Sequence, residues 1–171
     1  MSIEPDTKDW TWVLERPCPE CGFDASTLAA TAVADRVRAS VFGFRAALAR
    51  DHAAIRPRPD VWSPLEYACH VRDVHALYTE RLALMLDKHD PMFANWDQDA
   101  TAVEERYGEQ EPAVVADQLA IAAEAMAAAY DGVPADAWQR TGRRSDGANF
   151  TVDSFARYYL HDIEHHVYDV T

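Results

Sequence analysis

Basic residues are scarce in this 171-residue chain, which has 16 Lys and Arg residues against 29 Asp and Glu. The net charge of −13 repels both nucleic-acid phosphates and anionic lipid headgroups, so we expect neither nucleic acid nor a membrane as a partner. Long apolar runs are also missing, and no segment approaches the roughly 20 apolar residues of a membrane span. Hydrophobic residues still make up 49% of the chain, enough for the core of one globular domain.

Cysteine is scarce too, with only three residues, Cys18, Cys21 and Cys69. An odd number of cysteines in a chain of this length does not indicate a disulfide framework. The first ten residues, MSIEPDTKDW, contain acidic residues and a proline where a signal peptide needs a basic start and an apolar run. These features predict a cytoplasmic protein.

Four segments carry apolar residues at the three- and four-residue steps of an amphipathic helix. They cover residues 25–51, 63–89, 112–131 and 151–171. No segment gives a convincing strand signal, so the sequence predicts an all-α four-helix bundle. The link between the second and third segments is over 20 residues long, which permits a long crossover and lets these two helices run parallel.

The predicted domain organisation has two parts. Residues 1–24 form an irregular N-terminal segment that contains a CxxC motif, and residues 25–171 form the bundle. The clearest helix start lies at Ser63, an N-cap that is followed by Pro64 and completed by Glu66 as a capping box.

Three histidines are predicted to face the core of the bundle. His161 and His165 are four residues apart on the last helix, so their rings project from one face on successive turns. His70 interrupts the apolar stripe of the second helix between Tyr67 and Val74. A lone core histidine is more often a satisfied hydrogen-bonding group, but three together suit a divalent metal. We therefore expect one metal per chain, with Zn favoured and Ni or Fe as alternatives.

The remaining four histidines are not expected to bind the metal. His52 and His89 fall at helix C-termini, where the helix dipole favours them. His75 is rotated by about 140° from His70, by the 3.6-residue helical period. His166 is displaced from the predicted metal-binding face and is expected to be solvated.

The motif Cys18-Pro19-Glu20-Cys21-Gly22 has the form of a zinc-ribbon knuckle. A structural zinc needs four ligands, and the chain has no second CxxC motif. A half-site or a plain structural segment is therefore favoured over a zinc ribbon, with a redox pair as a third interpretation. Cys69 is expected to be a small packed residue.

Two stretches of this sequence resemble the DinB superfamily of metal-binding four-helix bundles. They are Trp62-Ser63-Pro64-Leu65-Glu66-Tyr67-Ala68-Cys69-His70 and His161-Asp162-Ile163-Glu164-His165-His166, and the resemblance covers about residues 25–170. It implies an up-down-down-up bundle in which His70, His161 and His165 are the metal ligands. Family members with known activity include mycothiol-dependent maleylpyruvate isomerase, which has a Glu in place of one His, and bacillithiol transferases.

The resemblance further implies a thiol-dependent S-transferase or isomerase, in which the metal activates a low-molecular-weight thiol toward an electrophile. Among the basic residues only Lys8 and Lys88 are lysine, and this Arg bias of a GC-rich genome favours mycothiol over bacillithiol. The alternatives are a binding protein that holds a metal without turnover and a structural or dimerising bundle. We expect a small-molecule thiol and an electrophile as partners, with a homodimer as an alternative to a monomer.

The surroundings of the predicted site give weaker indications. Ser154, Tyr158 and Trp62 are expected to present the electrophile to the bound sulfur. Arg143 and Arg144 are predicted either to hold a carboxylate or phosphate of a ligand or to lie in a solvated loop. No general acid or base is assigned.

Overall fold

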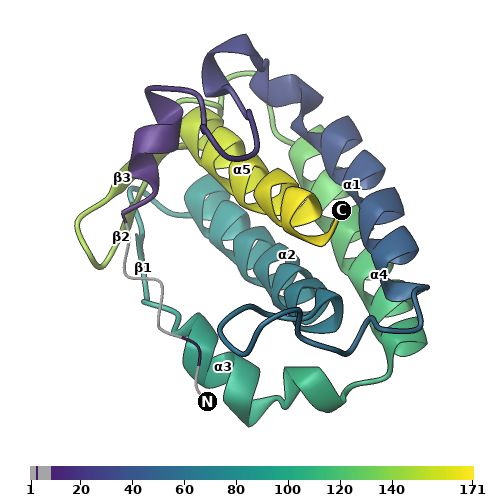
Figure 1. Cartoon of the computed structure of the whole chain (residues 1–171). Helices are drawn as coiled ribbons and strands as arrows, with labels where there is room; N and C mark the ends of the chain where they lie inside the picture. Colours follow the sequence, from purple (N-terminus) through teal and green to yellow (C-terminus); the bar gives the residue numbers. More distant parts are fainter. Residues whose placement is uncertain (1–2, 4–8) are drawn as a thin grey trace.

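The structure is a computed structural model that describes Ile3 and residues 9–171. The other residues of the predicted N-terminal segment, 1–2 and 4–8, lie outside the described part of the chain. The helices are α1 (Val33–Leu48), α2 (Pro64–Asp87), α3 (Gln98–Glu104), α4 (Pro112–Asp131) and α5 (Val152–Val170). The predicted bundle is confirmed, because α4 and α5 each pack against both α1 and α2 (Figure 1).

Contacts near the helix ends establish the direction of each long helix. Arg50, which follows α1, donates a hydrogen bond to the last backbone carbonyl of α5 at 2.8 Å, so α1 and α5 are parallel. Arg38 of α1 pairs with Asp131, the last residue of α4, so these two helices are antiparallel. Tyr67 in the first turn of α2 packs against His166 near the end of α5. The bundle is therefore up-down-down-up, as predicted.

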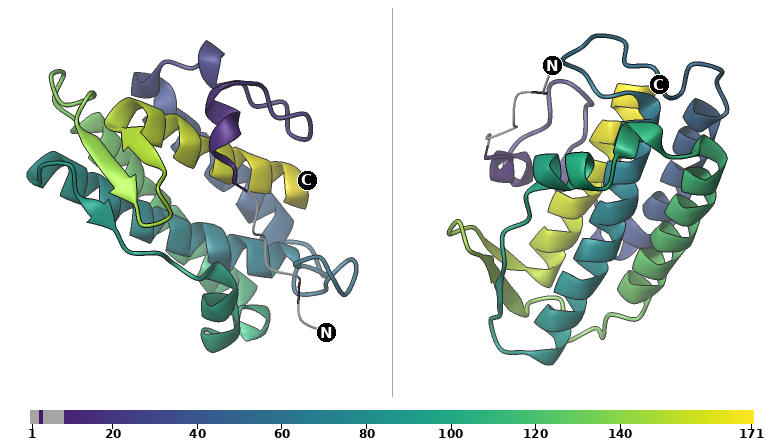
Figure 2. Two further views of the ribbon diagram at one scale, coloured as in Figure 1. Left: turned by 90° about the vertical axis from the view of Figure 1, so that its left-hand side faces the viewer. Right: turned by 90° about the horizontal axis from the view of Figure 1, so that it is seen from below.

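A small sheet was not predicted. Its strands are β1 (Met92–Phe93), β2 (Thr141–Arg144) and β3 (Asn149–Thr151), in the order β1-β2-β3. β1 pairs parallel with β2, and β2 pairs antiparallel with β3. Figure 2 shows this sheet beside the start of α5. Strands of two to four residues are too short to show an alternating pattern, and the β1–β2 pairing joins segments far apart in the sequence.

The first helix is shorter than the predicted range 25–51. Residues Ala25–Thr27 and Ala30–Ala32 form separate 3₁₀ turns, and α1 begins only at Val33. The side chain of Asp24 caps the first turn, and Leu28 between the turns is extended. The backbone carbonyls of Ala25 and Leu28 accept hydrogen bonds from Arg157 of α5, which stabilise this non-helical path of the chain.

The start of α2 is as predicted. The Ser63 side chain accepts from the Glu66 backbone N–H, and the Glu66 carboxylate accepts from the Ser63 backbone N–H at 2.8 Å. Glu66 also pairs with Arg56, which lies in the link between α1 and α2. This cap fixes the first turns of α2, on which His70 lies.

Among the described helices, α4 is the one with the length and hydropathy of a membrane span, which the sequence analysis did not predict. In this structure α4 is a helix of the bundle. Its acidic residues Asp117, Glu124 and Asp131 pair with Arg45 and Arg38 of α1.

Candidate metal centre

Two pairs of candidate ligands alternate along α5. His161 and His165 are one pair, and Asp162 and His166 are the other. Each pair has the four-residue spacing that places two side chains on the same face, and the two faces are about 100° apart by the helical period. The two pairs are offset by one residue along α5, so their side chains contact different parts of the protein.

The pair Asp162 and His166 faces α2. One ligand atom from each of His70, Asp162 and His166 lies within 4.8 Å of the others. The Nε2 atom of His70 is 3.9 Å from one carboxylate oxygen of Asp162, and the Nε2 atom of His166 is 3.4 Å from the other. Two ligands of a tetrahedral metal with bonds of about 2.1 Å are separated by roughly 3.4 Å. The three groups thus fit a divalent cation after small side-chain movements.

Asp169 orients the imidazole of His166. The Nδ1 atom of His166 lies 2.9 Å from a carboxylate oxygen of Asp169. An ionised carboxylate only accepts hydrogen bonds, so Nδ1 carries the proton and Nε2 is directed toward Asp162. Metal-binding histidines commonly have such a carboxylate partner, which fixes the tautomer and the ring orientation. This contact supports the assignment of Nε2 as a ligand atom.

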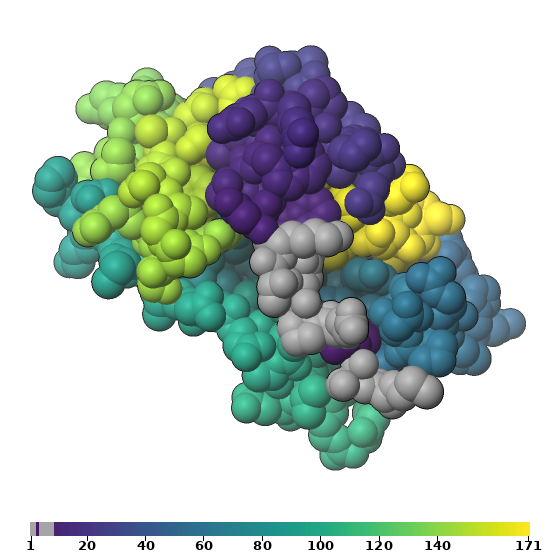
Figure 3. Space-filling view, turned by 60° about the vertical axis from the view of Figure 1, so that its left-hand side comes forward, coloured from purple at the N-terminus to yellow at the C-terminus, as the bar shows by residue number. Residues whose placement is uncertain are grey.

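The pair His161 and His165 faces the N-terminal segment instead. One ligand atom from each of Cys18, Cys21, His161 and His165 lies within 4.8 Å of the others. The sulfur of Cys18 is 3.7 Å from Nδ1 of His165. Figure 3 shows the N-terminal segment, in purple, packed against the yellow-green α5 on this face of the molecule.

The structure consequently divides the three ligands predicted from the sequence. His161 and His165 lie together as predicted, but His70 lies in the other group, with Asp162 and His166. The expectation that His166 is solvated was wrong, since only 17% of its side chain is exposed and it packs against His70. Sequence reasoning missed Asp162 because it looked for imidazoles; the Asp162–His166 spacing was the signal that could have found it.

His75, which is not expected to bind the metal, lies in the core of the bundle. Its side chain is fully buried, and its Nδ1 atom is hydrogen-bonded to the hydroxyl of Tyr159. It belongs to neither ligand group. His52 and His89 are exposed, as expected of residues near helix ends, and Cys69 is a buried packed residue as predicted.

Burial and charge give the histidines different proton affinities. Burial lowers the pKa of His70 to about 4, and the positive charge of His166 adds to the effect. Burial also lowers the pKa of His161 to about 4, with His165 as the second cause. Burial alone would lower the pKa of His166, but hydrogen bonds to Asp162 and Asp169 raise it to about 9. At neutral pH the metal-free site thus has a neutral His70 beside a protonated His166.

A cavity of about 520 Å³ gives access to the group of His70, Asp162 and His166. This volume is in the range of small-molecule binding sites. Aromatic and charged side chains line it; they include Tyr67, Trp96, Tyr158, Arg81, Arg144 and Glu20. The ring of Trp96 stacks on His70 with centroids 5.6 Å apart.

The two arginines of the cavity have different partners. Arg144 pairs with Asp146 and donates a hydrogen bond to the hydroxyl of Tyr158 at 2.8 Å. Arg81 is only 6% exposed; it donates to the backbone carbonyl of Ala94 and forms no ion pair with a carboxylate of the described residues. Burial lowers the pKa of Arg81. A buried guanidinium without a carboxylate partner favours an anionic group on the ligand.

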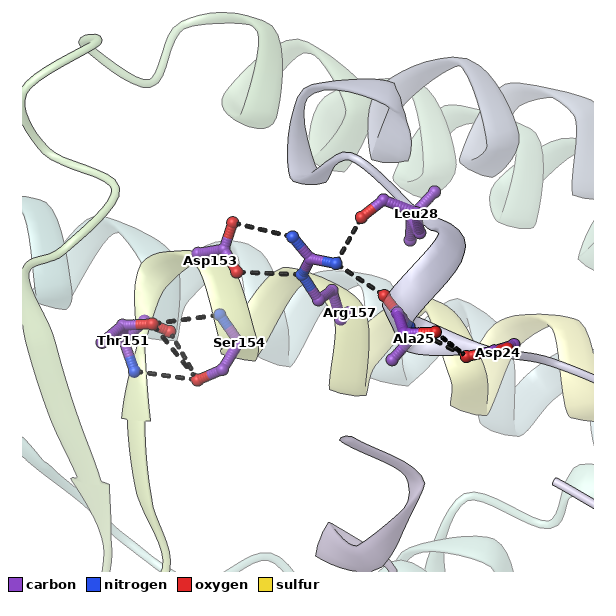
Figure 4. A network of polar contacts seen from close by, with 8 residues as sticks. Asp24, Ala25, Leu28, Thr151, Asp153, Ser154 and Arg157 are labelled. Carbon is purple, nitrogen blue, oxygen red and sulfur yellow. Dashed lines mark hydrogen bonds and ion pairs between the residues drawn. The ribbon is translucent and has the colours of Figure 1, made fainter. Parts of the chain in front are cut away.

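The other predicted surroundings have mixed outcomes. Tyr158 lines the cavity, and Trp62 packs on His70 with ring centroids 5.3 Å apart. Ser154 does not line the cavity; it completes the capping box of α5 with Thr151 (Figure 4). Arg143, unlike Arg144, pairs with Asp90 away from the cavity lining.

Both the sequence and the fold of this chain are similar to those of known proteins. The sequence profile of the DinB superfamily matches residues 33–170. Among solved structures, the chain is similar to YfiT from Bacillus subtilis, described as a probable metal-dependent hydrolase with an unusual four-helix bundle topology. The TM-score is 0.70 at 16% sequence identity, over 81% of this chain and 83% of YfiT. None of the curated protein sequences matches the chain.

Proposed function

Because the chain belongs to the DinB superfamily, we propose that it is a metal-dependent enzyme with its reaction centre at His70, Asp162 and His166. The observation that carries this proposal is the meeting of these three groups at a cavity of about 520 Å³. Three protein ligands leave coordination positions open, as catalytic metal sites require. A bound divalent cation would supply a Lewis acid that lowers the pKa of a thiol or a water at an open position.

The residues around the centre have separate tasks in this proposal. Asp169 holds a proton on Nδ1 of His166 and so keeps Nε2 available as a ligand. Trp62 and Trp96 both pack against the ring of His70 and restrict its rotation. These contacts preorganise the ligand set before a substrate binds.

We infer that the nucleophile is a low-molecular-weight thiol of the mycothiol type. In the proposed reaction the thiol loses its proton to solvent and is joined to an electrophile through its sulfur. The size of the cavity supports this, because about 520 Å³ is in the range of sites that bind a small organic molecule. The buried guanidinium of Arg81 indicates an electrophile that carries a carboxylate or another anionic group.

Hydrolysis is the second candidate reaction. The similarity to YfiT, described as a probable metal-dependent hydrolase, favours it. The same site would then activate a water, with no thiol required.

A panel of electrophiles with and without an anionic group tests both reactions. Each is incubated with the zinc-loaded and the metal-free protein, in the presence of mycothiol, bacillithiol or glutathione and in the absence of any thiol. Turnover that needs both metal and thiol supports the transferase, and turnover with metal alone supports the hydrolase. If neither occurs, and no thiol binds, the protein is a metal-binding protein without turnover.

Arg81→Met provides a sharper test of the substrate class. We expect it to raise KM for anionic electrophiles while leaving KM for neutral ones unchanged. An equal effect on both classes would contradict the assigned role of Arg81.

A further inference from the structure

The CxxC motif lies beside a histidine pair that the proposed reaction does not use. Cys18, His161 and His165 are between 1% and 8% exposed, and Cys21 is half-buried. All four residues offer ligand atoms within 4.8 Å of one another. The sequence alone favours a half-site or a plain structural segment, because the chain has no second CxxC motif; the structure supplies two imidazoles in its place.

The loop that carries the cysteines is closed on itself. The backbone N–H of Cys18 donates to the carbonyl of Phe23 at 2.8 Å, and the N–H of Gly22 donates to the carbonyl of Cys18 at 2.9 Å. Gly22 has a φ of +76°, a left-handed conformation that a residue with a Cβ adopts rarely. The closed loop holds both sulfurs toward α5.

The distances and the polar inventory indicate a shared cation. Ligands of a tetrahedral zinc with Zn–S bonds of about 2.3 Å and Zn–N bonds of about 2.05 Å are roughly 3.6 Å apart. The observed separation of Cys18 Sγ and His165 Nδ1 is 3.7 Å. The Nε2 atom of His161 is buried and has no hydrogen-bond partner among the described residues, which is costly unless another group binds it.

We propose that Cys18, Cys21, His161 and His165 form a second, structural metal site that binds Zn²⁺. Two thiolates and two neutral imidazoles are a complete tetrahedral set for zinc. Binding releases the two thiol protons to solvent, and two thiolates balance the charge of the cation, so the buried site is neutral overall. This site shares no ligand with the proposed reaction centre on the neighbouring face of α5, and its two histidines line the same cavity.

The zinc would fix the N-terminal segment as one wall of the cavity. Glu20 lies within the CxxC loop and Trp10 precedes it, and both side chains line the cavity. The ring of Trp10 packs against His161 and His165, with centroids 5.7 and 5.4 Å away. A second attachment lies nearer the start of α5, where Arg157 binds the carbonyls of Ala25 and Leu28 (Figure 4).

Cobalt substitution tests this proposal without any assay of activity. Reduced, metal-free, untagged protein is titrated with Co²⁺, and thiolate-to-cobalt charge-transfer absorption is recorded in the near ultraviolet. We expect this band in the wild type and in His166→Ala, which alters only the other ligand group. We expect its loss in Cys21→Ser, a conservative substitution at a half-buried position, and in Cys18→Ser.

Zinc content gives the second readout. The wild type should hold two zinc ions per chain, and the Cys18→Ser/Cys21→Ser variant should hold one. Cys69→Ser is the matched control, because it changes a buried cysteine outside both groups and should retain two. A wild type that binds cobalt without the charge-transfer band, or a double variant that keeps the full zinc content, would overturn the proposal. If only the proposed reaction centre fails, His166→Ala and the wild type hold equal zinc while the band persists.

Discussion

The two ligand groups on α5 differ in composition and in the number of ligands that they offer. The group of Cys18, Cys21, His161 and His165 combines two sulfurs with two nitrogens and has all four ligands that a tetrahedral zinc needs. The group of His70, Asp162 and His166 has two nitrogens and a carboxylate, and it lies at a cavity that His161 and His165 also line. Closed thiolate sites are typical of structural zinc, whereas three-ligand sites with access to solvent are typical of catalysis. In the proposed assignment, a shift of one residue along α5 would separate a structural from a catalytic ligand pair.

The largest expected effect is the loss of metal binding by His70, Asp162 and His166, which we call the open group because three ligands leave coordination positions free. We expect His166→Ala to abolish metal binding there and to reduce turnover by about 100-fold or more, since even partners of ligands account for 10- to 100-fold effects. The metal at the cysteine group should remain. Zinc content and turnover of the variant are the measurements, and His52→Ala, an exposed position outside both groups, is the control. Unchanged turnover in His166→Ala would remove the reaction centre from this place.

Cys18, Cys21, His161 and His165 form the closed group, which has all four ligands for zinc. Loss of its metal should mainly lower the free energy of unfolding. A zinc present at about 1,000 times its dissociation constant stabilises the folded state by about 4 kcal/mol. We expect the Cys18→Ser/Cys21→Ser variant to lose a stabilisation of this order, and the wild type to lose it on chelation. Chemical denaturation with and without a chelator measures this difference. Equal unfolding free energies for the variant and the zinc-loaded wild type would show that the group is not structural.

The pH dependence of metal binding should also separate the two groups. The pKa of His166 is about 9 in the metal-free protein, so below pH 9 a cation must displace its proton. We expect the apparent affinity of the open group to fall about tenfold per pH unit between pH 9 and 7. Titration of the Cys18→Ser/Cys21→Ser variant, in which only the open group remains, measures this slope. A flat profile over this range would contradict the proton linkage.

The same pKa has a consequence for the metal-free fold. Because the pKa of His166 is raised from 6.5 to about 9 on folding, its stabilising contribution is present below pH 6.5 and is lost as pH rises through 9. His70 has the opposite sign: its pKa is lowered to about 4, so stability is present above pH 6.5 and is lost as pH falls toward 4. The metal-free protein should therefore be most stable near neutral pH.

Some features of the fold could be predicted from the sequence, but the grouping of the candidate ligands could not. The capping box at Ser63 and the order of the long helices were predicted because their signals are local and periodic. The division of the ligands was not, since HDIEHH contains two pairs at four-residue spacing and the sequence does not state which face meets α2. The partner of the CxxC motif lies about 140 residues further along the chain, and only the folded structure brings the two together.

The smallest expected effect concerns the second attachment of the N-terminal segment. Arg157 binds the carbonyls of Ala25 and Leu28 and pairs with Asp153. We expect Arg157→Gln to cost about 1–3 kcal/mol of unfolding free energy, because two carbonyls lose a charged donor. Arg58→Gln removes an ion pair whose two side chains are each 70% exposed, and it should cost under about 1 kcal/mol. Similar losses in both variants would show that this attachment adds nothing.

An anomalous difference map from crystals of the zinc-loaded protein tests the central claim most directly. Two separate ligand groups on α5 predict two peaks per chain. One peak should lie among Cys18, Cys21, His161 and His165, and the other among His70, Asp162 and His166. A single peak coordinated by His70, His161 and His165 would contradict the account.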